Sequence, residues 1–225
     1  MKTPLFFLLI LLHGLTGCAA QQPSLPELTA EAKEDLGCEA AFPQGRWEFV
    51  HTIEFSMADG SGATVLGVTS LGGDEIACAL MTVEGFTLFE AVYREKKGLE
   101  VRRAVPPFDK PAFAAGLLED VRTIFRAPSP AKVQYGRAGG TIPTCRYTGV
   151  EGRITDVLPA RDGCWQIRTY GADHALTRSV AGSSCRKEGE SLIPEHLELK
   201  GFGHTNYTLK MTLIHVENLN EKTSP

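Results

Sequence analysis

Residues 46–57, Arg-Trp-Glu-Phe-Val-His-Thr-Ile-Glu-Phe-Ser-Met, decide the fold because apolar and polar side chains alternate along this stretch. One side carries mostly apolar residues: Trp47, Phe49, His51, Ile53, Phe55 and Met57. The other side is mostly charged or hydroxylated. A period of two over this length is typical of an antiparallel strand with one buried face and one face toward water. The stretch therefore predicts a β-sheet protein.

Shorter stretches of the same kind continue along the chain. Before a central helical segment we expect strands near 63–70, 75–83, 86–93 and 99–105. After that segment we expect strands near 145–149, 152–158, 164–170, 175–181, 191–200 and 206–216. Glycine-containing turns separate these stretches, which favours tight antiparallel connections. The pattern predicts a coiled antiparallel sheet, a sandwich or a barrel.

Two segments have the apolar spacing of amphipathic helices. Residues 25–36 place Leu25, Leu28, Ala32 and Leu36 on one stripe. Residues 112–126 follow Pro111, which suits a helix start, and carry a wider apolar stripe. Two helices are too few to cover both faces of so large a sheet. We therefore expect both helices to fill one concave face.

The N-terminus has the order of a secretory signal. Lys2 precedes an unbroken apolar run at residues 5–12, which is shorter than the roughly 20 residues of a membrane span. The tetrad Leu15-Thr16-Gly17-Cys18 then resembles the bacterial lipobox. This resemblance implies cleavage after residue 17, with diacylglycerol and an N-acyl chain on Cys18. The alternative is an ordinary secretory signal with a coincidental cysteine.

Residue 19 bears on where such a lipoprotein is sorted. It is alanine rather than aspartate, which resembles outer-membrane sorting. We therefore expect a protein anchored at the periplasmic face of the outer membrane. Its parts are a signal peptide (1–17), a lipidated tether (18–26), one domain (27–218) and a polar tail (219–225).

Composition limits the partners and the thiol chemistry. The formal net charge is −4, so no basic excess points to nucleic acid. Five cysteines remain besides Cys18, and thiols outside the cytoplasm tend to pair: Cys38, Cys78, Cys145, Cys164 and Cys185. An odd number leaves at least one thiol free. We expect Cys78, within an apolar run, to be buried and free, and two of the last three to pair.

No motif points to catalysis or to a resident cofactor. The histidines have no metal-ligand spacing, and Ser183-Ser184-Cys185 lacks the flanking glycines of a nucleophile elbow. A periplasmic hydrolase would need His51, Asp173 or His174 beside a nucleophile in a polar cleft. We expect a protein that is not an enzyme and that holds no metal.

Three stretches resemble the LolA/LolB superfamily of bacterial lipid-binding periplasmic proteins, and more closely the lipoproteins related to LolB. They are a hairpin tip at 69–73, a glycine-led strand start at 85–89, and a proline-led closing strand pair at 193–199 and 207–211. The resemblance spans roughly residues 40 to 216. The tip departs from the family because Ser70 stands where the family has proline, and the extra cysteines are also unlike LolB.

The resemblance implies a fold and a set of binding residues. The fold is an incomplete, strongly curved antiparallel β-barrel of about ten or eleven strands, with two or more helices closing its concave side. Leu71 is the expected exposed membrane tip, and the alternative is a leucine folded back on its hairpin. An apolar cavity would accept acyl chains, the alternative being a filled core. Its expected lining is Trp47, Phe49, Phe55, Met57, Phe86, Phe89, Leu117 and Val121.

The expected function is that of a membrane-anchored, monomeric lipid- or lipoprotein-binding protein. It would hold acyl chains for transfer or insertion at the outer membrane. A soluble periplasmic carrier would deliver the cargo, and relative affinity would drive the transfer. The alternative is a non-enzymatic structural or assembly lipoprotein of an envelope biosynthetic system, with a filled core.

Overall fold

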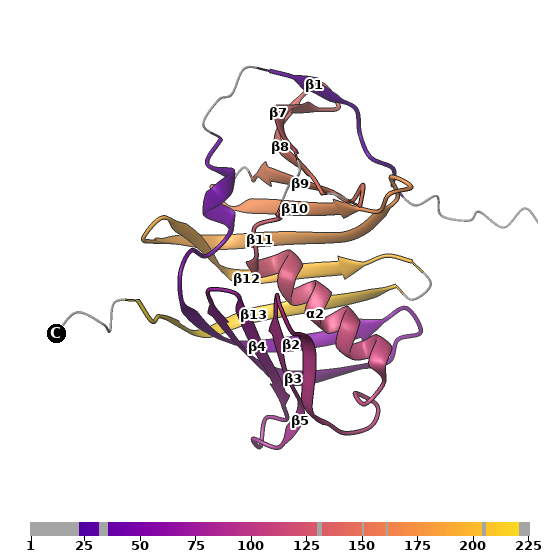
Figure 1. The fold of residues 1–225 in the computed structure, drawn as a ribbon, viewed down its shortest axis with the longest axis vertical. Coiled ribbons are helices and arrows are strands. Elements are labelled where there is room, and N and C mark those ends of the chain that lie inside the picture. The colour runs from indigo at the N-terminus through magenta and orange to yellow at the C-terminus, as the bar shows by residue number, and fades with distance from the viewer. Residues whose placement is uncertain are drawn as a thin grey trace, which may run out of the picture.

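One antiparallel sheet organises the chain (Figure 1). The computed structural model describes residues 23–31, 36–129, 132–149, 151–160, 162–203 and 206–220. Cys18, the signal peptide and most of the proposed tether and tail lie outside these residues. Within them, 13 strands form the sheet in the order β1-β7-β8-β9-β10-β11-β12-β13-β2-β3-β4-β5-β6.

Two meanders make up this sheet. The first contains β2 (Trp47–Met57), β3 (Gly62–Gly72), β4 (Glu75–Met81), β5 (Thr87–Arg94) and β6 (Gly98–Ala104). The second contains β7 (Lys132–Ala138), β8 (Ile142–Thr148), β9 (Ile154–Pro159), β10 (Trp165–Tyr170), β11 (Leu176–Glu188), β12 (Ser191–Gly201) and β13 (Tyr207–Asn218). The pairing of β13 with β2 joins them, with Leu209 opposite Phe55.

The terminal strands of the sheet, β1 (Leu28–Ala30) and β6, do not pair with each other. The prediction of a mainly β protein with an antiparallel sheet that does not close is therefore confirmed, with 13 strands in the described residues instead of ten or eleven. The predicted ranges omitted β1 and β7. Both contain polar residues and lie at one edge of the sheet, where apolar alternation is weak.

The helix predicted at 25–36 is wrong. Leu28–Ala30 is a strand that pairs with β7, and Leu28 lies opposite Ala138. Part of the predicted range, 32–35, lies outside the described residues. The helical spacing led to a wrong prediction because it reflects only the local sequence. The strand forms instead through backbone hydrogen bonds to the edge of β7. Gly136 permits this pairing, since a Cβ there would overlap the carbonyl oxygen of Thr29.

One α-helix, α2 (Pro111–Phe125), is present in the described part of the chain, together with the 3-10 turn η1 (Cys38–Ala41). The prediction of a helix at 112–126 is confirmed, and the prediction of two or more helices closing the concave side is wrong. Helix α2 lies across one face of the sheet (Figure 1). Its buried face consists of Ala114, Leu118, Asp120, Val121, Ile124 and Phe125.

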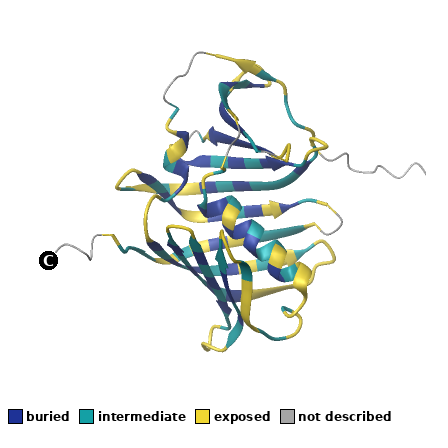
Figure 2. Cartoon of the chain, in the orientation of Figure 1, coloured by how far each residue is buried: buried dark blue, intermediate teal, exposed yellow. Residues whose placement is uncertain are grey.

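Aromatic side chains fill much of the space between α2 and the sheet. The ring of Phe125 lies 4.8 Å from that of Phe49, and the ring of Phe113 lies 5.6 Å from that of Phe89. Burial alternates along the strands, as Figure 2 shows, so one face of each strand contributes to this core. The period of two in β2 therefore identified the inward face correctly.

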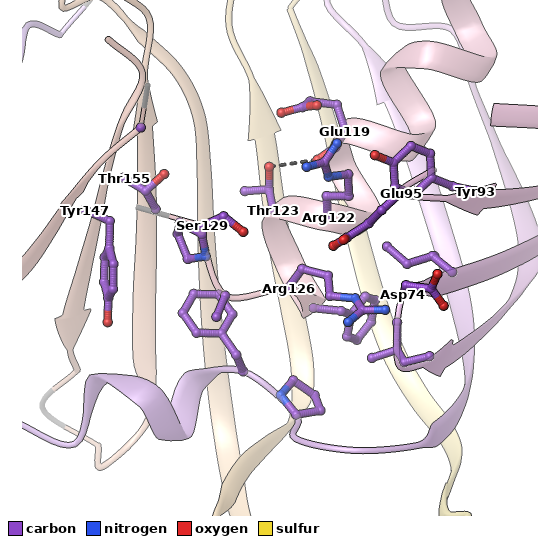
Figure 3. Close-up of a pocket in the computed structure, with 18 of the residues that line it drawn as sticks. Asp74, Tyr93, Glu95, Glu119, Arg122, Thr123, Arg126, Ser129, Tyr147 and Thr155 are labelled. Atoms are coloured by element: carbon purple, nitrogen blue, oxygen red, sulfur yellow. Dashed lines mark hydrogen bonds between the residues drawn. The ribbon is translucent and has the colours of Figure 1, made fainter. Parts of the chain in front are cut away.

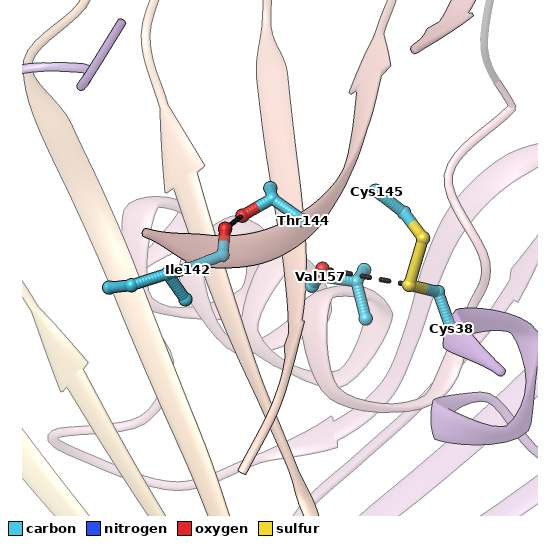
Figure 4. The surroundings of a disulfide bond; sticks show 5 residues. All are labelled: Cys38, Ile142, Thr144, Cys145 and Val157. Carbon is cyan, nitrogen blue, oxygen red and sulfur yellow. Dashed lines mark hydrogen bonds between the residues drawn. A yellow bond between two sulfur atoms is a disulfide. The ribbon is translucent and has the colours of Figure 1, made fainter. Parts of the chain in front are cut away.

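Two disulfides stabilise the second meander. Cys38–Cys145 joins η1 to β8 and lies beside Val157 (Figure 4), and Cys164–Cys185 joins the start of β10 to β11. Cys78 is free and buried, as predicted. The predicted pair among the last three cysteines is Cys164–Cys185, whereas the sequence left the partner of Cys38 open.

An N-terminal arm, residues 23–31, packs on the outer face of the second meander. Leu25 covers a small core of Ile154, Tyr170 and Leu176. Beside it, Arg146 donates two 2.7 Å hydrogen bonds to the buried carboxylate of Asp156 and a third to the carbonyl of Pro26. The arm therefore does not cover the inner face of the sheet, where α2 lies.

Candidate functional site

A pocket of about 620 Å³ opens at the C-terminal end of α2 (Figure 3). The last turns of α2 and residues 127–129 form one wall. The turns that follow β3 and β5 form another, and residues 42–45 with parts of β8 and β9 complete the lining. Ligand pockets of proteins commonly occupy about 300–1,000 Å³, so this volume suits a small organic ligand.

The pocket has an apolar floor. Phe42, Leu71, Ile76 and Phe125 line it, and each is buried in the hydrophobic core. Tyr93 and Tyr147 add two aromatic walls. Such a surface gains dispersion contacts and loses water when a hydrocarbon group covers it.

The mouth of the pocket is charged. Asp74 and Glu95 approach from the sheet side in Figure 3, and Arg122 and Arg126 approach from α2. Arg153 joins them from the segment between β8 and β9 and forms an ion pair with Glu119. A charged mouth above an apolar floor matches an amphiphile, which has a polar part and an apolar part.

The arginines at the mouth are held by specific contacts. Arg126 donates a 2.9 Å hydrogen bond to the carbonyl of Glu75 on β4. The guanidinium of Arg122 lies 5.2 Å from the centre of the Tyr93 ring, which is a cation–π distance. These contacts tie the C-terminal end of α2 to β4 and β5 of the first meander.

The eight residues predicted to line a cavity do not line this pocket. Trp47, Phe49, Phe89 and Val121 are buried in the core, and Phe55, Met57 and Leu117 are half-buried. Phe86 is 55 % exposed. The period of two identified which face points inward, but it carries no information on whether α2 and its aromatic residues fill the space there.

The prediction that Leu71 is an exposed tip is wrong. Leu71 is 3 % exposed, and β3 continues to Gly72, so the alternation of the strand turns Leu71 inward. It lies opposite Trp47 on β2 and Ile76 on β4. Leu71 therefore belongs to the floor of the pocket.

An exposed apolar tip does occur, on the next hairpin. Val83 and Phe86 lie between β4 and β5 and are 63 % and 55 % exposed. The guanidinium of Arg103 lies 5.5 Å from the centre of the Phe86 ring. Two apolar residues flanking Glu84-Gly85 in a turn were the sequence signal for this tip.

The structure does not bring the hydrolase candidates together. His51 is buried in β2 with its ring 6.1 Å from that of Phe49 and 6.1 Å from that of Phe125, and burial lowers its pKa to about 4. Asp173 and His174 lie in the turn between β10 and β11, with strands β11, β12 and β13 separating that turn from β2 in the sheet order.

Among the described residues, no group of three or more histidine, cysteine, aspartate or glutamate side chains could hold a metal ion. No helix in the same part of the chain has the length and apolar character needed to cross a membrane.

Comparisons with known proteins identify the fold. No protein family matches the sequence in a family scan, and no curated protein matches it. A LolA superfamily protein from Nitrosomonas europaea is similar in structure, with a TM-score of 0.52, 11% identity, and coverage of 84% of this chain and 93% of that chain. An outer membrane lipoprotein-sorting protein domain from Vibrio parahaemolyticus has a TM-score of 0.45 and 8% identity, over 83% and 93% of the two chains. The chain has a LolA/LolB-like fold.

Proposed function

We propose that the protein binds the acyl chain of a lipid or lipoprotein in the pocket at the end of α2. The observation that carries this proposal is the pairing of an apolar floor, which includes Leu71 and Phe125, with a mouth that carries Asp74, Arg122 and Arg126. An amphiphile satisfies both parts at once. Binding of this kind needs no covalent step, so the proposed protein is a carrier and not an enzyme.

The proposed setting is the periplasmic face of the outer membrane, with Cys18 as the lipid anchor. The exposed tip of Val83 and Phe86 supports this setting, because apolar side chains on a hairpin can insert among lipids. Cargo arrives from a donor such as a soluble periplasmic carrier and leaves to the adjacent bilayer. The direction of transfer follows the relative affinities of the donor, this protein and the bilayer for the cargo.

The test uses the mature chain with Cys18→Ser, so that its own lipid does not interfere. Titration with a fluorescent fatty acid and native mass spectrometry measure binding. Ser129→Trp places a large side chain at the exposed edge of the pocket, and we expect it to weaken binding about tenfold, or roughly 1.4 kcal/mol. Ser56→Trp, at an exposed position on β2 outside the pocket, is the matched control. Equal affinities of the two variants would contradict the assigned pocket.

A second candidate function is a non-enzymatic assembly lipoprotein with a filled core. The close packing of Phe49 on Phe125 and of Phe89 on Phe113 favours it, because these rings occupy the concave face. This candidate predicts that the chain with Cys18→Ser carries no lipid after purification and binds no fatty acid. The same titration therefore separates the two functions.

A further inference from the structure

Three residues form a row across the middle of the sheet, on strands β11, β12 and β13. Arg178 lies directly opposite Gly201, and Gly201 lies directly opposite Tyr207. Two polar side chains thus flank a glycine on neighbouring strands. Neither the pocket nor the hydrophobic core explains why this row is polar.

Asp120 of α2 accepts hydrogen bonds from both polar residues of this row. Nε of Arg178 donates a 2.7 Å hydrogen bond to Oδ1 of Asp120. The hydroxyl of Tyr207 lies 2.7 Å from Oδ1 and 2.8 Å from Oδ2 and donates to this carboxylate. Asp120 is 5 % exposed, so the carboxylate is removed from water and depends on these two donors.

Gly201 makes the arrangement possible. A Cβ at this position would overlap the ring of Tyr207. Any side chain at residue 201 would therefore displace the ring that carries the hydroxyl to Asp120. The ring of Tyr207 also lies 6.4 Å from that of Phe55.

Arg178 and Tyr207 can donate the same hydrogen bonds to the carboxylate of a ligand as they donate to Asp120. A guanidinium and a phenol that converge on one carboxylate form charge-assisted hydrogen bonds, which are among the stronger hydrogen bonds in proteins. Burial and the neighbouring Asp120 both raise the pKa of Tyr207, so its hydroxyl remains protonated and able to donate. Without a carboxylate, Arg178 would be a largely buried cation with no counter-charge.

The row lies close to the pocket along α2. Glu119 and Thr123, on the same turns of the helix as Asp120, line the pocket. Arg178 and Tyr207 do not line the pocket themselves, so a ligand carboxylate reaches them only when Asp120 moves away.

We propose that Arg178 and Tyr207 form a carboxylate-binding site, which Asp120 occupies in the ligand-free protein and for which the carboxylate of a long-chain fatty acid competes. This inference rests on the proposed function, because the ligand enters at the pocket. It specifies the chemical class of the ligand. For the same hydrocarbon chain, the protein binds a carboxylate head more tightly than a neutral head.

The test compares cis-parinaric acid with its methyl ester, two fluorescent probes that share one hydrocarbon chain. The protein is the mature chain with Cys18→Ser, with and without Asp120→Ala. Removing the competing carboxylate is expected to increase the affinity for the acid at least tenfold and to change the affinity for the ester less than threefold. Adding Arg178→Gln and Tyr207→Phe to Asp120→Ala is expected to cancel the gain.

Glu31→Ala is the matched control, because it removes a carboxylate that pairs with an arginine, Arg137, and neither residue lines the pocket. It should produce no gain specific to the acid. An equal gain for acid and ester in Asp120→Ala would mean that the helix is only loosened, and it would overturn the proposal. No gain for either probe would also overturn it. If Asp120→Ala does not fold, Asp120→Asn keeps the volume, and we expect the same preference for the acid at a smaller ratio.

A second measurement does not depend on the proposed function. Sodium acetate, compared with sodium chloride at equal ionic strength, should raise the thermal midpoint of Asp120→Ala but not that of the unaltered chain. An acetate effect without binding of either fluorescent probe would support the carboxylate site and contradict the acyl-binding pocket. No acetate effect would contradict the site even if both probes bind.

Discussion

The two ends of α2 meet the sheet in different ways. Near its N-terminus, Phe113 packs against Phe89 and Phe108, and the space is filled. Near its C-terminus, Phe125 packs against Phe49 on one side, while Arg122 and Arg126 border an open pocket on the other. One amphipathic helix thus provides both a packed core and one wall of a candidate binding site. The predictions below begin with the packed side and end at the open one.

The largest expected effect is on the packed side. Phe49→Ala removes a ring that is 1 % exposed and contacts Phe125, so it should lower the free energy of unfolding by about 3–5 kcal/mol. Urea denaturation followed by circular dichroism measures this loss. Phe86→Ala, which truncates an exposed phenylalanine, is the control and should change the free energy by less than about 0.5 kcal/mol. Similar losses in both variants would mean that the core beneath α2 is not packed as described.

Protonation of His51 at acidic pH should destabilise the same packed region. Burial lowers its pKa to about 4 in the folded state, below the ordinary value of 6.5, so the unfolded chain binds a proton more readily between these values. Stability should therefore fall as the pH falls from 6.5 toward 4, by roughly 2 kcal/mol between pH 7 and pH 5. Urea titrations at the two pH values measure the difference. His51→Gln should remove this part of the pH dependence, and an unchanged pH profile in that variant would assign it to other groups.

The exposed tip should affect membrane contact but not folding. Phe86→Ser is expected to weaken the association of the chain carrying Cys18→Ser with phospholipid vesicles about tenfold, because one buried aromatic side chain contributes roughly 1.5–3 kcal/mol. Vesicle sedimentation measures the association. Ile214→Ser is the matched control, since Ile214 is also an exposed apolar residue but lies on β13, away from this hairpin. Equal losses in both variants would argue against a specific role for the tip.

The smallest expected effect is at the mouth of the pocket. Arg122→Gln removes an exposed cation that lies over Tyr93, so it should change the free energy of unfolding by at most about 1 kcal/mol. Urea denaturation again provides the measurement, with Arg102→Gln on the edge strand β6 as the control. A loss as large as that of Phe49→Ala would mean that the open end of α2 is part of the core.

The sequence located most elements of the fold and few residues of the candidate site. The alternation in 46–57 located β2 and its inward face, and the helical spacing after Pro111 located α2. The same kind of spacing misplaced residues 25–36, because β1 exists only through its pairing with β7. Leu71 was singled out but assigned to the wrong environment, since β3 ends at Gly72, two residues later than predicted, and the alternation of the strand places Leu71 in the core.

Local pattern alone therefore determined most of the strands and the apolar face of β2, because backbone geometry imposes a period of two on strands and of 3.6 on helices. It also indicated that Cys78 is buried and unpaired. Only the tertiary structure decided that Cys38 pairs with Cys145, that the concave face is filled by aromatic rings, and that Asp120 meets Arg178 and Tyr207. These contacts join residues between 58 and 107 positions apart, or depend on the volume left between α2 and the sheet, and no local periodicity encodes either quantity.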